Sequence, residues 1–173
     1  MDVTERIATV FTASGPRPEL AGRLGVFEPL IGSWDLVVHN FDEDGGVRTV
    51  DGEWHFGWAL DGRALADVWI SPARVSRVGG VDGEWGMSLR FYDEKIDAFR
   101  STWLGPGNGW VIPFLGERTE DGFEIEADTG GVRRRWIFSE LTAASFSWRA
   151  EETLPDEAPF VRQRFEATRA LSG

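Results

Sequence analysis

Cysteine is missing from this chain of 173 residues, which excludes disulfide bonds, thiolate metal sites and cysteine nucleophiles. Histidine is scarce, with 2 residues, and no further ligand stands at a metal-binding spacing. The sequence also lacks the Gly-x-Ser-x-Gly and His-Glu-x-x-His motifs of common hydrolases. We therefore expect no metal and no cofactor.

Long apolar runs and positive charge are scarce as well. No stretch approaches the roughly 20 apolar residues of a membrane span, and the N-terminus has no signal-peptide core. The 18 basic and 29 acidic residues give a net charge of −11, which repels phosphate backbones and anionic lipid headgroups. We expect a cytoplasmic protein whose partner is an apolar small molecule rather than a nucleic acid or a membrane. A homodimer is left open.

Large aromatic residues, by contrast, are abundant. The chain contains 12 Phe and 9 Trp but 1 Tyr, together with 21 Gly, and 42% of its residues are hydrophobic. A chain of this length corresponds to one domain and can bury a sizeable core.

Apolar residues in the first 30 positions recur at helical spacing. They form two sets, Val3, Ile7, Val10 and Phe11 in the first and Leu20, Leu24 and Phe27 in the second. The break at Ser14-Gly15-Pro16 between them predicts two short helices. We expect residues 1–30 to form a helical cap and residues 31–173 to form the main domain.

From Gly32 onward the hydrophobic period changes to two, the period of a strand with one buried face. Turn signals such as Asp61-Gly62, Gly79-Gly80 and Gly130-Gly131 separate about ten such segments. Short connections favour an all-β antiparallel meander, and closing it into an up-and-down β-barrel removes the exposed edges. A β-sandwich is the alternative.

Three motifs in this order resemble the calycin superfamily of lipocalins and fatty-acid-binding proteins, and in particular a bacterial lipocalin-like family of unknown function. The first, Leu30-Ile31-Gly32-Ser33-Trp34, resembles the Gly-x-Trp opening of the calycin barrel. The others are the hairpin at 57–63 and the Tyr-Asp turn with its Ser-Thr-Trp strand at 89–103. The resemblance implies a barrel that binds a small apolar molecule, with the first-strand Trp covered by an Arg from the last strand. Arg162, Arg164 and Arg169 are all eligible for that position.

Hairpin pairing predicts which side chains face the barrel interior, because directly opposed residues share a face. Pairing Trp34 with Trp54 and Trp54 with Trp69 gives a row of three inward tryptophans. The same register sets Asp67 opposite Phe56 and therefore inward.

The C-terminal half contains a polar inward row that runs Ile125, Arg134, Ala150 and Gln163. It follows from opposing Phe123 with Trp136, Trp136 with Trp148 and Trp148 with Phe165. An inward Arg134 beside Gln163 suits a ligand carboxylate or carbonyl; alternatively, Arg134 pairs with an inward acidic residue at the barrel mouth.

Two functions remain open. The first is a non-catalytic binding barrel for an apolar or aromatic molecule. Its predicted ligand-binding residues are Phe56, Trp58, Trp69, Trp85, Phe91, Trp103, Trp136, Trp148, Arg134 and Gln163. The second is a cofactor-independent isomerase, cyclase or lyase on the same barrel, with Asp67 as base, Arg134 as oxyanion stabiliser and Tyr92 as acid.

Overall fold

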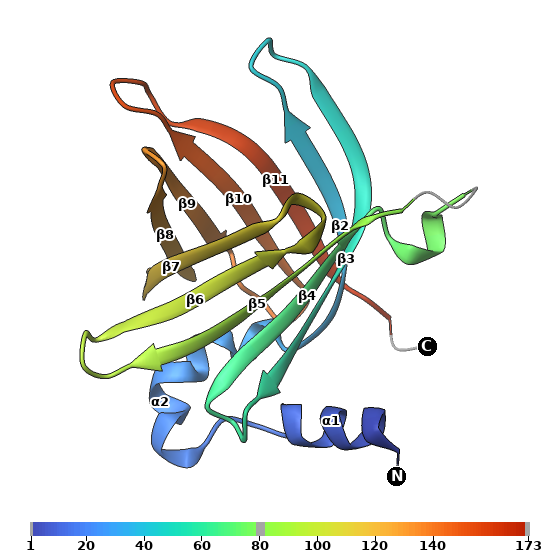
Figure 1. Ribbon diagram of the computed structural model, residues 1–173, viewed down its shortest axis with the longest axis vertical. Helices are drawn as coiled ribbons and strands as arrows, with labels where there is room; N and C mark the ends of the chain where they lie inside the picture. Colours follow the sequence, from blue (N-terminus) through green and yellow to red (C-terminus); the bar gives the residue numbers. More distant parts are fainter. Residues whose placement is uncertain (1, 79–81, 172–173) are drawn as a thin grey trace.

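The computed structural model describes residues 2–78 and 82–171, and its main element is a closed antiparallel β-barrel (Figure 1). Ten strands close through a pairing of β3 with β4, and the short β1 (Thr12–Ala13) adds an eleventh strand beside β3. The barrel strands are β2 (Gly32–Phe41), β3 (Val47–Ala59), β4 (Ala64–Ser71), β5 (Glu84–Asp93), β6 (Ala98–Gly105), β7 (Trp110–Arg118), β8 (Phe123–Thr129), β9 (Val132–Ser139), β10 (Ser145–Thr153) and β11 (Phe160–Arg169). The predicted all-β antiparallel barrel is confirmed, while the turn at Gly79-Gly80 lies outside the described residues.

Helical segments precede the barrel and interrupt two of its loops. They are α1 (Val3–Phe11), η1 (Pro18–Leu20), α2 (Ala21–Leu24), η2 (Gly25–Leu30), η3 (Arg74–Ser76) and η4 (Pro106–Asn108). Among the described residues, no helix combines the length and the apolarity needed to cross a membrane.

The segment α2–η2 closes one end of the barrel. Its apolar side chains Leu24, Phe27 and Leu30 are fully buried, and the Phe27 ring lies 4.9 Å from the rings of both Phe99 and Phe123. Contact with two barrel strands makes this segment part of the same core as the barrel interior.

Helix α1 lies outside that core. A capping box between Asp2 and Glu5 stabilises its first turn, but the helix buries no residue, and Val3, Ile7 and Val10 are all exposed. The helical spacing therefore predicted the helix correctly. The expectation that this helix covers the barrel end is wrong, because α1 buries none of its residues. Only the second part of residues 1–30 covers the barrel end.

The Gly-x-Trp motif at the start of β2 is explained by Arg169. Of the three eligible arginines, Arg169 covers Trp34, with its Cζ 4.1 Å from the ring centroid. The Trp34 indole donates a hydrogen bond of 2.7 Å to the Leu30 carbonyl. Gly32 has a φ of +126°, and a Cβ at this position would lie 2.6 Å from Nη1 of Arg169. The glycine is required both for this backbone conformation and for the passage of the guanidinium.

Most predicted strand pairings are present. Trp34 pairs with Trp54, Trp54 with Trp69, and Phe56 with Asp67, as the hairpin analysis predicts. Alternation along these strands directs their apolar residues into one barrel interior.

The register predicted for β9 differs from the observed register by two residues. Phe123 pairs with Phe138 instead of Trp136, and Trp148 also pairs with Phe138. The reason is the turn between β8 and β9, whose central residues Gly130 and Gly131 have φ of +63° and +77°. A turn of this kind needs a positive φ at both central positions, which favours glycine at both. The turn therefore centres on Gly130 and Gly131, whereas the predicted pairing would centre it on Thr129 and Gly130. A shift of two residues preserves the face, and Arg134 still points inward.

Candidate functional site

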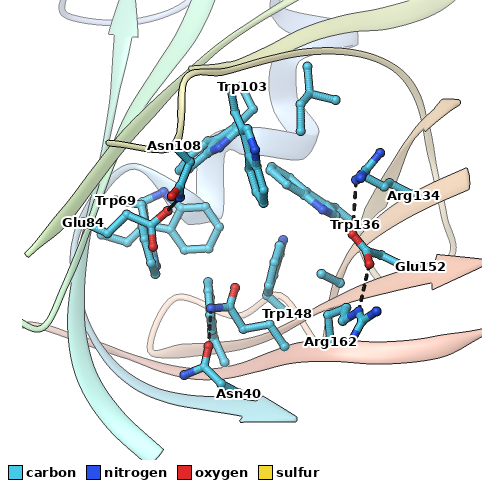
Figure 2. Close-up of a pocket in the computed structure, with 16 residues that line it drawn as sticks. Asn40, Trp69, Glu84, Trp103, Asn108, Arg134, Trp136, Trp148, Glu152 and Arg162 are labelled. Carbon is cyan, nitrogen blue, oxygen red and sulfur yellow. Dashed lines mark hydrogen bonds and ion pairs between the residues drawn. The ribbon is translucent and has the colours of Figure 1, made fainter. Parts of the chain in front are cut away.

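The barrel contains a cavity of about 510 Å³, whose lining includes Asn40 near the end of β2 and Glu84 at the start of β5. These residues lie at the strand ends away from α2–η2, which contacts Tyr92 and Phe99. The walls of the cavity come from strands around most of the barrel, together with η4 (Figure 2). The lining residues are Asn40, Trp54, Trp69, Glu84, Trp103, Asn108, Trp110, Ile112, Arg134, Trp136, Trp148, Ala150, Glu152, Arg162, Gln163 and Phe165. This volume lies in the range of small-molecule sites, roughly 300 to 1,000 Å³.

Five aromatic side chains form a closed ring of contacts around the cavity, which we call the aromatic girdle. Its members are Trp69 on β4, Trp103 on β6, Trp136 on β9, Trp148 on β10 and Phe165 on β11. Successive ring centroids, from Trp69 round to Phe165 and back, lie 6.1, 5.5, 5.5, 4.2 and 5.8 Å apart. These are favourable aromatic spacings, so the girdle presents an ordered apolar wall.

A glycine on β5 allows the girdle to cross that strand. Gly86 pairs with Trp69 on β4, and the Trp103 ring from β6 lies directly over it. A Cβ at position 86 would overlap this ring. The gap between Trp69 and Trp103 is therefore closed by ring contact across β5.

Two indole N–H groups of the girdle are buried without an acceptor among the described residues. These are Nε1 of Trp69 and Nε1 of Trp148. The deeper Trp54, in contrast, donates a hydrogen bond of 2.8 Å to Asp67. Because a buried unpaired donor costs roughly 1 to 3 kcal/mol, an acceptor that reached either N–H would stabilise the girdle.

One side of the cavity mouth is a network of paired charges. Arg134 donates a hydrogen bond of 2.6 Å to the Thr129 hydroxyl, and its Nε lies 3.2 Å from Glu152. Arg162 lies 2.8 Å from the same Glu152 carboxylate and 2.6 Å from Glu43 (Figure 2). Both guanidinium groups therefore lie within ion-pair distance of Glu152, although Arg134 Nε is buried without a hydrogen-bond acceptor among the described residues.

Gln163 is also engaged within the protein. Its amide donates a hydrogen bond of 2.8 Å to the Asn40 side chain. The structure brings Arg134 and Gln163 into one cavity, and each binds a neighbouring side chain there.

The opposite side of the mouth holds a carboxylate without a cation. Glu84 accepts a hydrogen bond of 2.9 Å from the Asn108 amide (Figure 2). Within residues 2–78 and 82–171, Glu84 forms no salt bridge. Burial raises the pKa of Glu84, and the Asn108 hydrogen bond opposes this rise only in part.

Asp67 does not line this cavity. It forms a fully buried ion pair with Arg90 and accepts the Trp54 hydrogen bond. The Arg90 guanidinium also lies over the Phe138 ring, with its Cζ 5.4 Å from the centroid. Asp67 points inward as predicted, but its carboxylate is enclosed, so the interpretation of Asp67 as a base with access to a ligand is wrong.

Tyr92 lies at the barrel end near α2. Its hydroxyl bonds to Asp97, and the Arg23 guanidinium lies 4.8 Å above its ring. The candidate acid is therefore not brought together with Arg134.

The aromatic residues predicted to bind a ligand divide into three groups. Trp69, Trp103, Trp136 and Trp148 line the cavity. Phe56 and Trp58 are buried in the core away from it. Trp85 and Phe91 are 44% and 40% exposed, because the alternation of β5 turns Gly86 and Arg90 inward. The placement of these last two in the barrel interior is wrong.

The comparisons with known proteins concern the fold. No protein family and no curated protein matches the chain in sequence. Among solved structures, the S-type phycobiliprotein lyase CPES from Guillardia theta matches with a TM-score of 0.58 and 12% sequence identity. The match covers 91% of this chain and 99% of that chain. Together with the ten-stranded barrel, it supports a calycin-like fold.

Proposed function

We propose that this protein is a binding barrel that holds a small aromatic molecule in its cavity. The observation that carries the proposal is the aromatic girdle, a ring of five aromatic side chains around a cavity of about 510 Å³. A flat ring inserted there would exchange water for ring faces and edges on several sides. Each well-placed aromatic pair contributes about 0.5 to 1.5 kcal/mol beyond the burial of its area.

The proposal does not include catalysis. The phycobiliprotein lyase shares the barrel fold with this chain, and 12% identity supports no transfer of its activity. The enzymatic alternative depended on Asp67, which is enclosed in its ion pair with Arg90. A carrier or binding protein accounts for the cavity without requiring an acid and a base in contact with the ligand.

Titration with 2-naphthylmethanol tests the proposal, because this probe is flat, aromatic and uncharged. Isothermal calorimetry should show saturable binding to the wild-type protein. Ala150 lies in the cavity wall, and Ala150→Phe should abolish the binding by filling the space. Trp85→Phe, on the outer face, is the control and should bind like the wild type. Absence of saturable binding by the wild-type protein would overturn the proposal.

A further inference from the structure

Glu84 and the aromatic girdle together define the chemistry of the ligand. We propose that the cavity takes an aromatic amine, with its ring inside the girdle and its ammonium group on the Glu84 carboxylate. This inference rests on the proposed function and deepens it.

The charges that line the cavity do not pair evenly. The lining contains two carboxylates, Glu84 and Glu152, and two guanidinium groups, Arg134 and Arg162. Both arginines bind Glu152, and Arg162 also binds Glu43 outside the lining. Of the two lining carboxylates, Glu84 is the one that has no cation partner among the described residues.

The position of Glu84 suits contact with a ligand. It is the first residue of β5, two residues before Gly86 and hence on the same inward face. One of its oxygens, Oε1, accepts the Asn108 amide, and no described residue donates to the other. Glu84 is half-buried, and the next residue on its face, Gly86, pairs with Trp69 and lies under the Trp103 ring.

Such a carboxylate binds an ammonium group well. Partial burial weakens its hydration, and the raised pKa of Glu84 has this burial as its main cause. A ligand ammonium would donate charge-assisted hydrogen bonds to the free oxygen. Tryptophan faces also attract cations, and four indoles line the same cavity as this carboxylate.

An anionic ligand fits less well. To reach Arg134 or Arg162, a ligand carboxylate would have to compete with Glu152, and it would approach a chain of net charge −11. We therefore place the charged group of the ligand at Glu84, whereas the sequence suggested a ligand oxyanion at Arg134.

Three probes of nearly equal shape separate the possibilities: 2-naphthylmethylammonium, 2-naphthylmethanol and 2-naphthoate. With the wild-type protein at pH 7, calorimetry should show that the ammonium binds at least roughly tenfold more tightly than the alcohol, because a hydrogen bond to a charged group is worth about that factor or more. The naphthoate should bind most weakly.

Glu84→Gln should reduce the advantage of the ammonium over the alcohol to less than about threefold and leave alcohol binding in place. Glu117→Gln is the matched control, because it removes the same charge from an exposed residue outside this cavity and should preserve the advantage. Retained alcohol binding shows that the Glu84 variant is folded.

The outcomes are distinct. Equal binding of ammonium and alcohol, or tightest binding of the naphthoate, by the wild-type protein would overturn the amine inference and leave the binding function standing. An advantage that survives Glu84→Gln would also overturn it. If the alcohol does not bind the wild-type protein, the proposed function itself fails, and the inference fails with it.

Discussion

Arg169, on the last strand, covers the ring of Trp34 in the calycin-like Gly-x-Trp motif. Its Cζ is 4.1 Å from the centroid of the indole, and its Nη1 and Nη2 donate to the carbonyls of Ile31 and Pro29 at 2.8 and 2.7 Å. One side chain from β11 thus contacts both β2, the first strand of the barrel, and the helical segment η2 that precedes it.

Arg169→Leu should lower the free energy of unfolding by roughly 2 to 4 kcal/mol, because charged hydrogen bonds to carbonyls and a cation–π contact are lost together. Urea denaturation measures the change. Arg164→Leu is the control, since Arg164 is exposed and lies 3.9 Å from an exposed Glu166. Equal effects of the two substitutions would contradict the role given to Arg169.

Asp67→Asn should destabilise the protein by about 3 to 5 kcal/mol, because it leaves the buried Arg90 charge without its partner. The double variant Asp67→Leu with Arg90→Met should recover much of this loss, since no charge then remains buried. Chemical denaturation gives both values. Normal stability of Asp67→Asn would show that the ion pair is not structural.

Gly86→Ala should weaken the binding of 2-naphthylmethanol and cost about 1 to 3 kcal/mol of stability, because the new methyl group displaces the Trp103 ring. Gly57→Ala on β3 is a matched control, as a Cβ there meets nothing within 4 Å. Calorimetry and denaturation should therefore separate the two variants. Similar behaviour would show that Trp103 adjusts freely and that the girdle is not held in place.

The stability of the protein should depend on Glu53 at acid pH. Its carboxylate accepts hydrogen bonds from the Arg74 side chain, which lower its pKa from 4.5 to about 2. A lowered folded-state pKa contributes stability that is present above pH 4.5 and is lost as the pH falls towards 2.

The difference in unfolding free energy between wild type and Glu53→Gln should consequently shrink over that interval. Denaturation curves at pH 6, 4 and 2.5 would measure it. A difference that is constant with pH would contradict the lowered pKa.

The sequence predicts those parts of the barrel in which neighbouring strands are joined by tight turns. Asp61-Gly62 fixes the pairing of β3 with β4, and alternation then places Trp54 and Trp69 inside. Between Ser71 and Glu84 the chain makes a long connection, which leaves the face of β5 undetermined. For this reason the sequence predicts the wrong face of β5 for Trp85 and Phe91.

The polar groups at the cavity mouth are positioned by contacts between segments that are distant in sequence. Glu84 and Asn108 are 24 residues apart, and Arg162 meets Glu43 at a separation of 119. No local sequence pattern predicts contacts between residues so far apart in the chain. A signal for the inward face of Glu84 lies in the small residues Gly86 and Ser88, because Gly86 makes room for the large Trp103 ring from the next strand. This signal can be used only once the register of β5 is known.

The aromatic girdle has an optical consequence. Its four indoles lie at steep angles to one another, with interplanar angles of 65°, 77° and 68° along the series Trp69, Trp103, Trp136 and Trp148. Excited states of chromophores so close and so inclined mix, and the mixing gives circular dichroism bands of opposite sign. A ligand that enters between the rings would change the coupling of all four at once. Under the proposed function, circular dichroism would therefore report occupancy of the cavity without an attached label.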